Sequence, residues 1–314
     1  MALGLLAGLA PAGAQAVHRQ QVSTNFGQTA PHDPADLPAS RTSVQWPERV
    51  AKRMPAPRLD LSEDGSYRIT GGWELREAGT EEWIDAIVPG TVLTSLVAAG
   101  IYPDPYYGLN NLAIPDDLCR KDWWYRTELP LTEELLSRKR LELLFEGINY
   151  RADVWLNGVR LGRIDGAFAR GRFDITPISR KENTLEVHIY PPQNPGIPHE
   201  QSARTGRGPN GGVLCLDGPT FISSEGWDWV PGVRDRNIGI WQDVRLLPTE
   251  GVTLGDARIV TDLPLPSTEY ADLTVETTVS NTLEQDVLAV VKAVNKGEIK
   301  VCVDNSEVMI KVEE

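Results

Sequence analysis

The sequence predicts an all-β protein, folded as a β-sandwich or barrel. From Leu61 onward the chain reads as short runs of about 5–8 residues in which polar and apolar side chains alternate, as in half-buried strands. Turn-forming residues separate these runs, and only one segment before the strand runs has the hydrophobic spacing of a helix. Many short strands with few helices are typical of sandwiches and barrels.

The first sixteen residues, MALGLLAGLAPAGAQA, read as a signal peptide. The apolar run closes on Ala14-Gln15-Ala16, which has the small-x-small form of a cleavage site. No Lys or Arg precedes the run, so a disordered alanine-rich tail is the alternative. No later stretch approaches the about 18 apolar residues that a membrane span needs. We therefore expect a secreted or periplasmic protein without a membrane span.

Residues 17–58 are predicted to form a loose leader. They are rich in Gln, Pro, Ala, Ser and Thr and show no periodicity. Within the leader, residues 43–55 (SVQWPERVAKRMP) have the composition of one short helix ended by Pro55.

Residues 59–249 are predicted to form the main domain. Its one helical segment is GTVLTSLVAAG, in which Val92, Leu93, Leu96 and Val97 share a face and Gly100 ends the helix. The strand runs are GSYRITGGWELREAG, EWIDAIVPG, DWWYRTELPL, RLELLFEGI, YRADVWLNGVRLGRID, RGRFDIT, NTLEVHIYPP and IWQDVRLLPT.

Two further features of the strand region have specific predictions. Asn157-Gly158 is a dipeptide that accepts positive φ at both central turn positions, so 154–156 and 159–161 are expected to pair as a hairpin. Trp155 and Trp241 lie inside alternating strands and are predicted to belong to the core.

Residues 250–314 are predicted to start a second, immunoglobulin-like sandwich. Leu273, Val275 and Val279 alternate onto one face of a strand. Only about 65 residues remain, whereas such sandwiches take about 100. The Lys/Glu-rich tail at 295–314 also differs from the body of the chain. We therefore expect an incomplete sandwich and a chain that stops partway through a larger protein.

Composition argues against several classes of function. The formal charge is −13, with Lys+Arg 31 against Asp+Glu 44, so a nucleic-acid partner bound through its phosphates is not expected. The three cysteines and four histidines are scattered and show no metal-ligand spacing. His188 lies in a strand-like run and is interpreted as a face residue. No metal or other cofactor is predicted.

Catalytic motifs are also missing from the sequence. There is no G-x-S-x-G elbow, no phosphate-binding loop and no H-E-x-x-H. The glycine-rich stretch at 205–212 lacks a flanking strand and helix, so an exposed flexible loop is the better interpretation. Asp235, between two arginines, is interpreted as a salt-bridged structural acid. No catalytic residue is assigned.

Aromatic residues beside polar ones indicate carbohydrate. Sugars present C–H faces that pack on aromatic rings and hydroxyls that need paired donors and acceptors. Trp227 and Trp229 flank Asp228 in a run that also contains Pro and Gly, so a site carried by a loop is favoured over core packing.

These residues resemble the amino-terminal sugar-binding sandwich of glycoside hydrolase family 2, above all its β-mannosidase and exo-β-glucosaminidase branches. The resemblance covers about residues 60 to 250. It is carried in order by VPGTVLTSLVAAGIYPDPYYGLNN, DWWYRTELPL, LLFEGINYRADVWLNGVRLG and GWDWVPGVRDRNIGIWQDVRL.

The resemblance implies a galactose-binding-like jelly roll of about eight strands, then the immunoglobulin-like sandwich. Family members continue into a (β/α)₈ barrel, where two glutamates hydrolyse a terminal β-linked sugar with retention. Neither glutamate has a matching position here, so the chain alone is expected to be inactive. The resemblance further implies that Asp228, with Trp227 and Trp229, contacts a β-linked oligosaccharide or glycoconjugate, and that Asn110 and Asn111 are rim contacts.

Two alternatives remain open from the sequence. A free-standing carbohydrate-binding module would bind glycans without any barrel encoded downstream. A structural or adhesive sandwich would bury Trp227 and Trp229 and show no fluorescence change with sugar.

Overall fold

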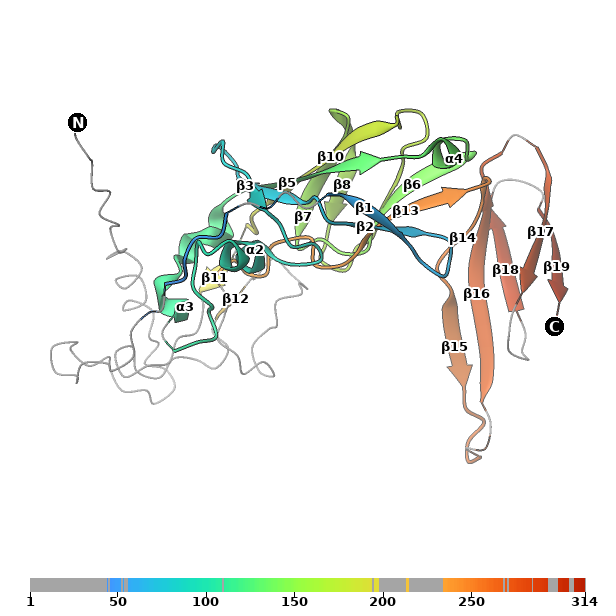
Figure 1. The fold of residues 1–314 in the computed structure, drawn as a ribbon. Coiled ribbons are helices and arrows are strands. Elements are labelled where there is room, and N and C mark those ends of the chain that lie inside the picture. The colour runs from blue at the N-terminus through green and yellow to red at the C-terminus, as the bar shows by residue number, and fades with distance from the viewer. Residues whose placement is uncertain are drawn as a thin grey trace, which may run out of the picture. The chain divides into compact units, whose positions relative to one another are not determined.

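The computed structural model describes residues 44, 46–51, 53, 56–108, 110–193, 195–197, 213–214, 234–267, 269, 271–283, 285–292, 299–304 and 308–313 (Figure 1). The predicted signal peptide lies outside these residues. The described residues divide into two compact units. The first holds those of 44–136 and 142–247, and the second holds those of 137–141 and 248–313.

The first unit is built from two antiparallel sheets, which confirms the all-β prediction (Figure 1). One sheet has five strands and the other has six, more than the eight in all that the resemblance implied. In spatial order the first contains β1 (Arg58–Leu61), β2 (Tyr67–Thr70), β13 (Val244–Thr249), β6 (Arg140–Phe145) and β9 (Gly171–Asp174). The second contains β4 (Ile84–Asp85), β3 (Glu74–Glu77), β5 (Trp123–Pro130), β10 (Glu182–Tyr190), β7 (Arg151–Leu156) and β8 (Val159–Asp165).

Alternation along the central strands builds the core. On β5, Trp123, Tyr125, Thr127 and Leu129 are buried, while the residues between them are half-buried or exposed. The neighbouring strand β10 alternates in the same way and pairs with β5 along its length. A period of two places successive side chains on opposite faces, so one face of each strand is apolar and packs inward. The largest buried side chains include Trp73, Tyr125, Phe145, Leu75, Leu129, Leu141 and Leu143.

The predicted hairpin is confirmed. Strands β7 and β8 pair across Asn157-Gly158, with Leu156 opposite Val159. The φ angles of Asn157 and Gly158 are 54° and 77°, the left-handed values that this two-residue turn requires. A register shift follows between Val154 and Trp155.

The predicted helix is also confirmed, as α2 (Val92–Ala98). Thr91 caps it by accepting a hydrogen bond from the Thr94 N–H at 3.2 Å, and Gly100 follows it with φ 70°. Among the described residues, three shorter helices were not predicted, because a single turn has too few residues to show a period. They are α3 (Asn110–Ala113), the 3₁₀ helix η3 (Asp116–Arg120) and α4 (Glu133–Leu136).

The predicted leader helix at 43–55 is wrong for its described residues. Residues 46–51 belong to no helix or strand. They lie beside the end of α2, where the Val50 N–H donates to the Ala99 carbonyl at 2.9 Å. A contact with a distant segment therefore replaces the local hydrogen bonds that a helix would have made.

The outer face of the six-stranded sheet carries a cluster of half-buried aromatic rings. Trp124 stacks on His188 with ring centroids 4.4 Å apart, and Trp155 lies 5.3 Å from Trp124. His188 is thus a face residue, as predicted. The prediction that Trp155 and Trp241 belong to the core is wrong, since both are half-buried. Alternation identifies a two-faced strand but does not reveal that its outer face is itself partly covered.

Asp153 anchors the polar edge of this cluster. Its carboxylate accepts two hydrogen bonds from Arg163, one from Arg160 and one from the Tyr190 hydroxyl, at 2.8–2.9 Å. The carboxylate is almost fully buried, whereas both arginines are about half exposed. Hydrogen bonds from Arg163, followed by those from Arg160 and Tyr190, hold the pKa of Asp153 well below its usual range.

We expect Asp153→Asn to lower the free energy of unfolding by about 2 kcal/mol at pH 7, because charge-assisted bonds to a buried carboxylate are lost. A depressed pKa contributes stability that is complete above the unfolded-state pKa, about 3.9, and disappears as pH falls toward the folded-state value. The gap between wild type and variant should therefore shrink between pH 5 and about pH 2. Urea denaturation across this range measures it.

Asp165→Asn is the matched control for Asp153→Asn. Asp165 is paired with Arg151 on the same sheet, but its side chain is 45% exposed, so its loss should cost less than about 0.5 kcal/mol. A wild-type-to-Asp153→Asn gap that stays constant down to low pH would contradict the assigned role.

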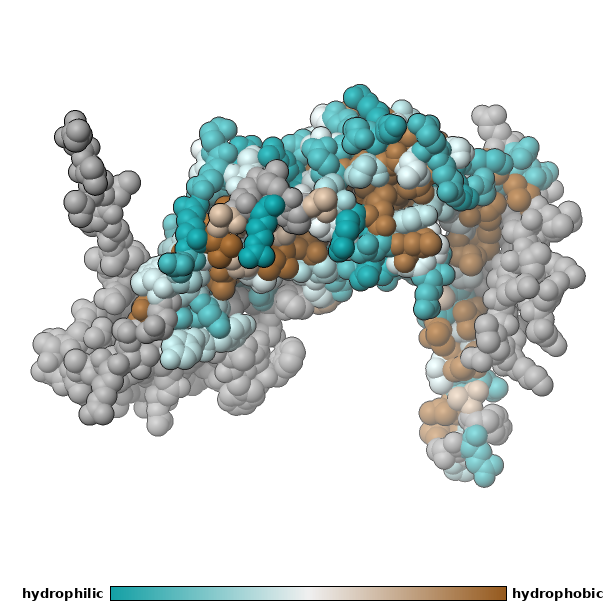
Figure 2. All heavy atoms as spheres, viewed as in Figure 1, coloured by the Kyte–Doolittle hydropathy of each residue, from teal (hydrophilic) through white to brown (hydrophobic). Residues whose placement is uncertain are grey.

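The second unit is strand-rich, and part of its surface is apolar. Strands β14 (Val252–Leu254), β16 (Asp272–Asn281), β15 (Arg258–Asp262) and β18 (Ile299–Asp304) form one sheet. Strands β17 (Val287–Lys292) and β19 (Val308–Glu313) form another. Figure 2 shows hydrophobic side chains over β15 and its neighbours. Exposed ones include Leu254, Ile259, Leu263, Leu265 and Leu273.

A membrane-spanning helix was not predicted from the sequence. Across the described ranges, no helix is long and apolar enough to cross a bilayer.

Candidate functional site

The predicted sugar contacts come from two stretches of the sequence, 227–229 and 110–111. Trp227, Asp228 and Trp229 lie outside the described residues. Asn110 and Asn111 are described and begin α3. Asn110 is only 2% exposed, whereas Asn111 is half-buried. Their contact with sugar stays a prediction, and Asn111 has the more accessible side chain of the two.

The turn before α3 presents two aromatic rings to solvent. Tyr106 and Tyr107 are 74% and 60% exposed. The turn itself is ordered by Asp104, whose side chain accepts a hydrogen bond from the Tyr106 N–H at 2.9 Å. The Asn110 N–H donates to the Tyr107 carbonyl at 3.0 Å. Exposed rings on a fixed turn suit the C–H face of a sugar.

A buried arginine connects the Asn110-Asn111 segment with the residues that follow Trp227-Asp228-Trp229, which we call the W-D-W run. The Arg234 Nε donates to the Asn111 carbonyl at 3.1 Å, although the two residues are 123 positions apart. Arg234 is 2% exposed. The first turn of α3, which carries Asn111, and a residue six positions after Asp228 are therefore held in contact.

Asp235 fixes the same loop to the first turn of α2. Its carboxylate accepts hydrogen bonds from the Leu93 N–H at 2.6 Å and the Asn237 N–H at 2.9 Å. The residue is completely buried, and burial raises the pKa of the carboxyl, while the Leu93 and Asn237 donors oppose the rise. Asp235 is a structural acid, as predicted, but the predicted salt bridge is not found among the described residues: the two hydrogen bonds above come from backbone N–H groups, whereas the flanking arginines donate to the Asn111 and Pro195 carbonyls. Backbone N–H groups of α2 and of its own turn hold the carboxylate in place.

Arg236 and Asn149 lock the turn from its other side. The Arg236 Nε donates to the Pro195 carbonyl at 2.8 Å, and Arg236 has no exposed surface. The Asn149 side-chain amide donates to the carbonyls of Arg236 and Asn237 at 2.9 and 3.0 Å. Arg236 and Asn237 both have left-handed φ values, which side-chain and backbone contacts on several elements maintain.

Close backbone packing between residues 90–92 and 238–240 adds a further set of contacts that hold this loop. The Gly90 N–H donates to the Ile240 carbonyl and the Val92 N–H to the Ile238 carbonyl, both at 2.8 Å. Gly239 has φ 153°, and a Cβ at this position would lie 2.6 Å from the Gly90 oxygen. Only glycine allows the two segments to approach this closely.

Together these contacts fix the position of residues 234–240, which we call the frame. None of them brings together two carboxylates that could act as a catalytic pair. Asp235 is occupied by backbone donors, so it positions the loop and is not available as a base. No group of three or more potential metal ligands occurs among the residues with described positions. The arrangement can hold a loop against an aromatic turn, which is what a binding rim requires.

Comparison with known proteins identifies the domain. A family profile described as "Glycosyl hydrolase 2 galactose-binding domain-like" matches residues 73–242, a range that includes the frame. The chain belongs to glycoside hydrolase family 2.

Its curated family 2 relatives are much longer than the chain. A mannosylglycoprotein endo-β-mannosidase of Lilium longiflorum is 38% identical over 183 residues, which are 57% of this chain and 19% of that protein. An exo-β-D-glucosaminidase of Streptomyces avermitilis is 31% identical over 214 residues, 67% of this chain and 21% of that protein. The chain thus spans about a fifth of the length of these relatives.

A solved structure has the same fold. The exo-chitosanase of Amycolatopsis orientalis aligns with a TM-score of 0.52 at 23% identity, covering 70% of this chain and 24% of that one. The jelly-roll prediction is therefore confirmed at the level of fold.

Sequence reasoning missed most of the residues that hold the frame. Asn149 and Arg236 lie within two of the runs that carry the family resemblance, but those runs do not indicate which residues are in contact, because the partners are remote in sequence. Arg234 was noticed only as a neighbour of Asp235. The usable signal was the density of charged and aromatic residues in 223–245, which marks the loop and leaves its contacts undetermined.

Proposed function

We propose that this chain is the sugar-binding part of a retaining β-glycosidase that hydrolyses terminal β-mannosyl or β-glucosaminyl residues. The catalytic glutamates lie outside the chain, in a barrel that it joins as a partner domain. The proposal includes export to the periplasm or the outside, directed by residues 1–16.

One observation supports the proposal most directly. The Arg234 Nε, six positions after Asp228, donates to the Asn111 carbonyl at 3.1 Å, so the chain shortly after the predicted Trp227–Trp229 contacts is held against the second segment that the resemblance assigns to sugar binding. The relatives' names supply the substrate classes, a mannosidase and a glucosaminidase, which act on β-linked sugars.

The side chains of the W-D-W run are suited to form one wall of a sugar pocket that another domain completes. An aspartate that accepts hydrogen bonds from two sugar hydroxyls gains about 1.5–3 kcal/mol from each when the contact is buried. Trp227 and Trp229 would cover the C–H faces of the same sugar. Such a loop binds sugar and supplies neither a nucleophile nor an acid, so hydrolysis needs the barrel.

Two measurements on the 314-residue chain test the function. We expect weak, saturable binding of β-1,4-linked mannobiose or glucosamine disaccharide, followed by tryptophan fluorescence, and no hydrolysis of p-nitrophenyl β-D-mannoside. A chain that hydrolyses the mannoside by itself, or that binds neither disaccharide, would overturn the proposal.

The coding sequence after codon 314 distinguishes the proposed glycosidase from the remaining alternative, a free-standing carbohydrate-binding module. An open reading frame encoding a (β/α)₈ barrel supports the glycosidase. A stop codon together with strong disaccharide binding would instead indicate a free-standing carbohydrate-binding module.

A further inference from the structure

The loop between β8 and β9 presents an exposed aromatic ring. Phe168 is 64% exposed, and its ring meets Trp241 edge to face, with ring centroids 5.6 Å apart and ring planes at 83°. The neighbouring residues of the loop are small, namely Gly166, Ala167 and Ala169. No larger apolar side chain of this loop therefore stands beside the ring.

Hydrogen bonds hold this loop against the end of the frame. The Trp241 Nε1 donates to the Ala167 carbonyl at 2.9 Å, and Ala167 itself is only 1% exposed. The Gly166 N–H donates to the Tyr150 carbonyl at 2.8 Å. Because Trp241 directly follows the frame, the loop that carries Phe168 is fixed to it.

The strand registers place this loop at the same end of the sandwich as the Asn110-Asn111 segment, which precedes β5. Strands β5, β10, β7 and β8 are neighbours in that order. In one row across them, Trp123 lies opposite Ile189, Ile189 opposite Ala152, and Ala152 opposite Ile164. Neighbouring strands are about 4.8 Å apart, so this row is about 14 Å long. The chain that enters β5 and the chain that leaves β8 therefore emerge at the same end of the sheet.

A polar pair lies close to Phe168 in the sequence. Asp165, three positions earlier, accepts two hydrogen bonds from Arg151, at 3.0 and 3.5 Å, and the Asp165 side chain is 45% exposed. Further lone pairs on this carboxylate and further N–H groups on the guanidinium remain for hydroxyl groups.

These surroundings favour a sugar over a protein partner. In a protein interface, an aromatic anchor is packed within a core of other apolar side chains. Phe168 instead stands among small residues, near a partly exposed ion pair. A single ring can pack on the C–H face of a sugar, while nearby polar groups bond its hydroxyls.

We propose that Phe168 stacks on a sugar unit beyond the terminal one, so that this end of the sandwich recognises an oligosaccharide. The inference rests on the proposed function, which supplies the site for the terminal sugar. About 14 Å separates the strand ends that lead to the Asn110-Asn111 segment and to Phe168. A single sugar ring does not span that distance, whereas a short oligosaccharide does. A ring on a fixed loop also loses little conformational freedom on binding.

Calorimetric titration of the full 314-residue chain tests the inference with two pairs of ligands. One pair is methyl β-D-mannopyranoside and β-1,4-linked mannotriose, and the other is methyl β-D-glucosaminide and the β-1,4-linked glucosamine trimer. In the pair that the wild type binds, Phe168→Ala should weaken trisaccharide binding about five- to tenfold, because the apolar contact of one ring face is lost. The affinity for the methyl glycoside should not change.

A local probe reports on the same loop. Nitrogen-15 labelling of tryptophan follows the Trp241 indole N–H by NMR, and the Trp241→Phe variant assigns its signal. We expect this signal to shift and saturate with the trisaccharide and to stay in place with the methyl glycoside.

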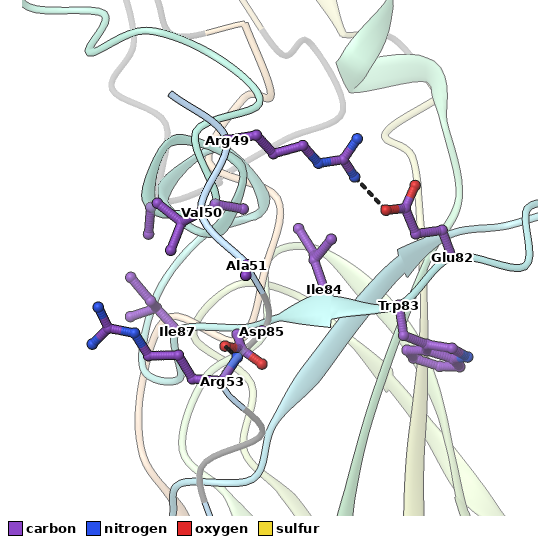
Figure 3. A pocket seen from close by; sticks show the side chains of 11 residues that line it. Arg49, Val50, Ala51, Arg53, Glu82, Trp83, Ile84, Asp85 and Ile87 are labelled. Carbon is purple, nitrogen blue, oxygen red and sulfur yellow. Dashed lines mark hydrogen bonds and ion pairs between the residues drawn. The ribbon is translucent and has the colours of Figure 1, made fainter. Parts of the chain in front are cut away.

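Three variants control the titration. Phe168→Tyr keeps the ring and should retain the affinity, whereas Phe168→Leu keeps an apolar side chain without a flat face and should behave like Phe168→Ala. Val50→Ala is the matched control. Val50 is 45% exposed and lines a cavity beside the end of α2, to which the loop contributes no residue (Figure 3). Its truncation should leave both affinities unchanged.

The outcomes separate this inference from the function on which it rests. Thermal melts should show the Phe168 variants folded, because the side chain is on the surface. A wild type that binds none of the four ligands would contradict the proposed function, and this inference with it. If the wild type binds, unchanged trisaccharide affinity in Phe168→Ala, or an equal loss for both ligands of a pair, would overturn the inference alone. Unchanged affinity is also the result expected if the ring contacts another domain.

Discussion

Asp228→Ala is expected to weaken sugar binding by the chain about 100-fold, and to lower kcat/KM at least as much in the enzyme that carries the barrel. An aspartate that accepts two sugar hydroxyls loses about 3–6 kcal/mol when it is removed, of which 2.7 kcal/mol already corresponds to about 100-fold. The melting temperature should stay nearly unchanged, because the proposed role is binding. Calorimetric titration and steady-state kinetics measure the two effects.

Asp262→Ala is the matched control for Asp228→Ala. Asp262 is an exposed carboxylate at the end of β15 in the second unit, so its removal changes the net charge equally without touching the proposed site. Affinity should be retained. If Asp228→Ala instead prevented folding, Asp228 would be a structural residue and the assignment of the loop would be wrong.

Asp235→Ala is expected to lower the free energy of unfolding by about 4 kcal/mol. The change leaves the N–H groups of Leu93 and Asn237 without their acceptor inside the fold, at about 1–3 kcal/mol each, and adds a small cavity. In a unit of this size the melting temperature should fall by roughly 8–16 °C. Sugar binding should weaken as well, because the same turn contacts the Asn111 segment through Arg234.

Asp235→Asn provides the graded control for Asp235→Ala. The amide oxygen can still accept one of the two hydrogen bonds, so about half of the stability should return. Equal stability of wild type and Asp235→Ala in urea denaturation would show that the carboxylate does not hold α2.

Local patterns allowed some elements to be predicted and misplaced others. The hairpin at Asn157-Gly158 and the helix α2 depend on neighbouring residues, so the sequence carried enough information for both. The leader helix failed because Val50 bonds to Ala99, which lies 49 positions away. Trp155 was misplaced because its covering ring, Trp124, comes from a different strand.

For the candidate site as well, one part could be predicted from the sequence and another part could not. The aromatic and acidic composition of the W-D-W run predicted a sugar contact from the sequence, and the family resemblance added Asn110 and Asn111 to the prediction. The contact between Arg234 and the Asn111 carbonyl joins residues 123 positions apart. Spacing along a chain does not specify such contacts.

The sequence by itself determined the strand-built architecture and the family, because alternation, turn dipeptides and ordered motifs are all local or collinear. Only the tertiary structure decided which acid supports the loop and which tryptophans face outward. Each of these depends on packing between strands and loops far apart in the chain, where burial changes what a carboxylate or an indole can do.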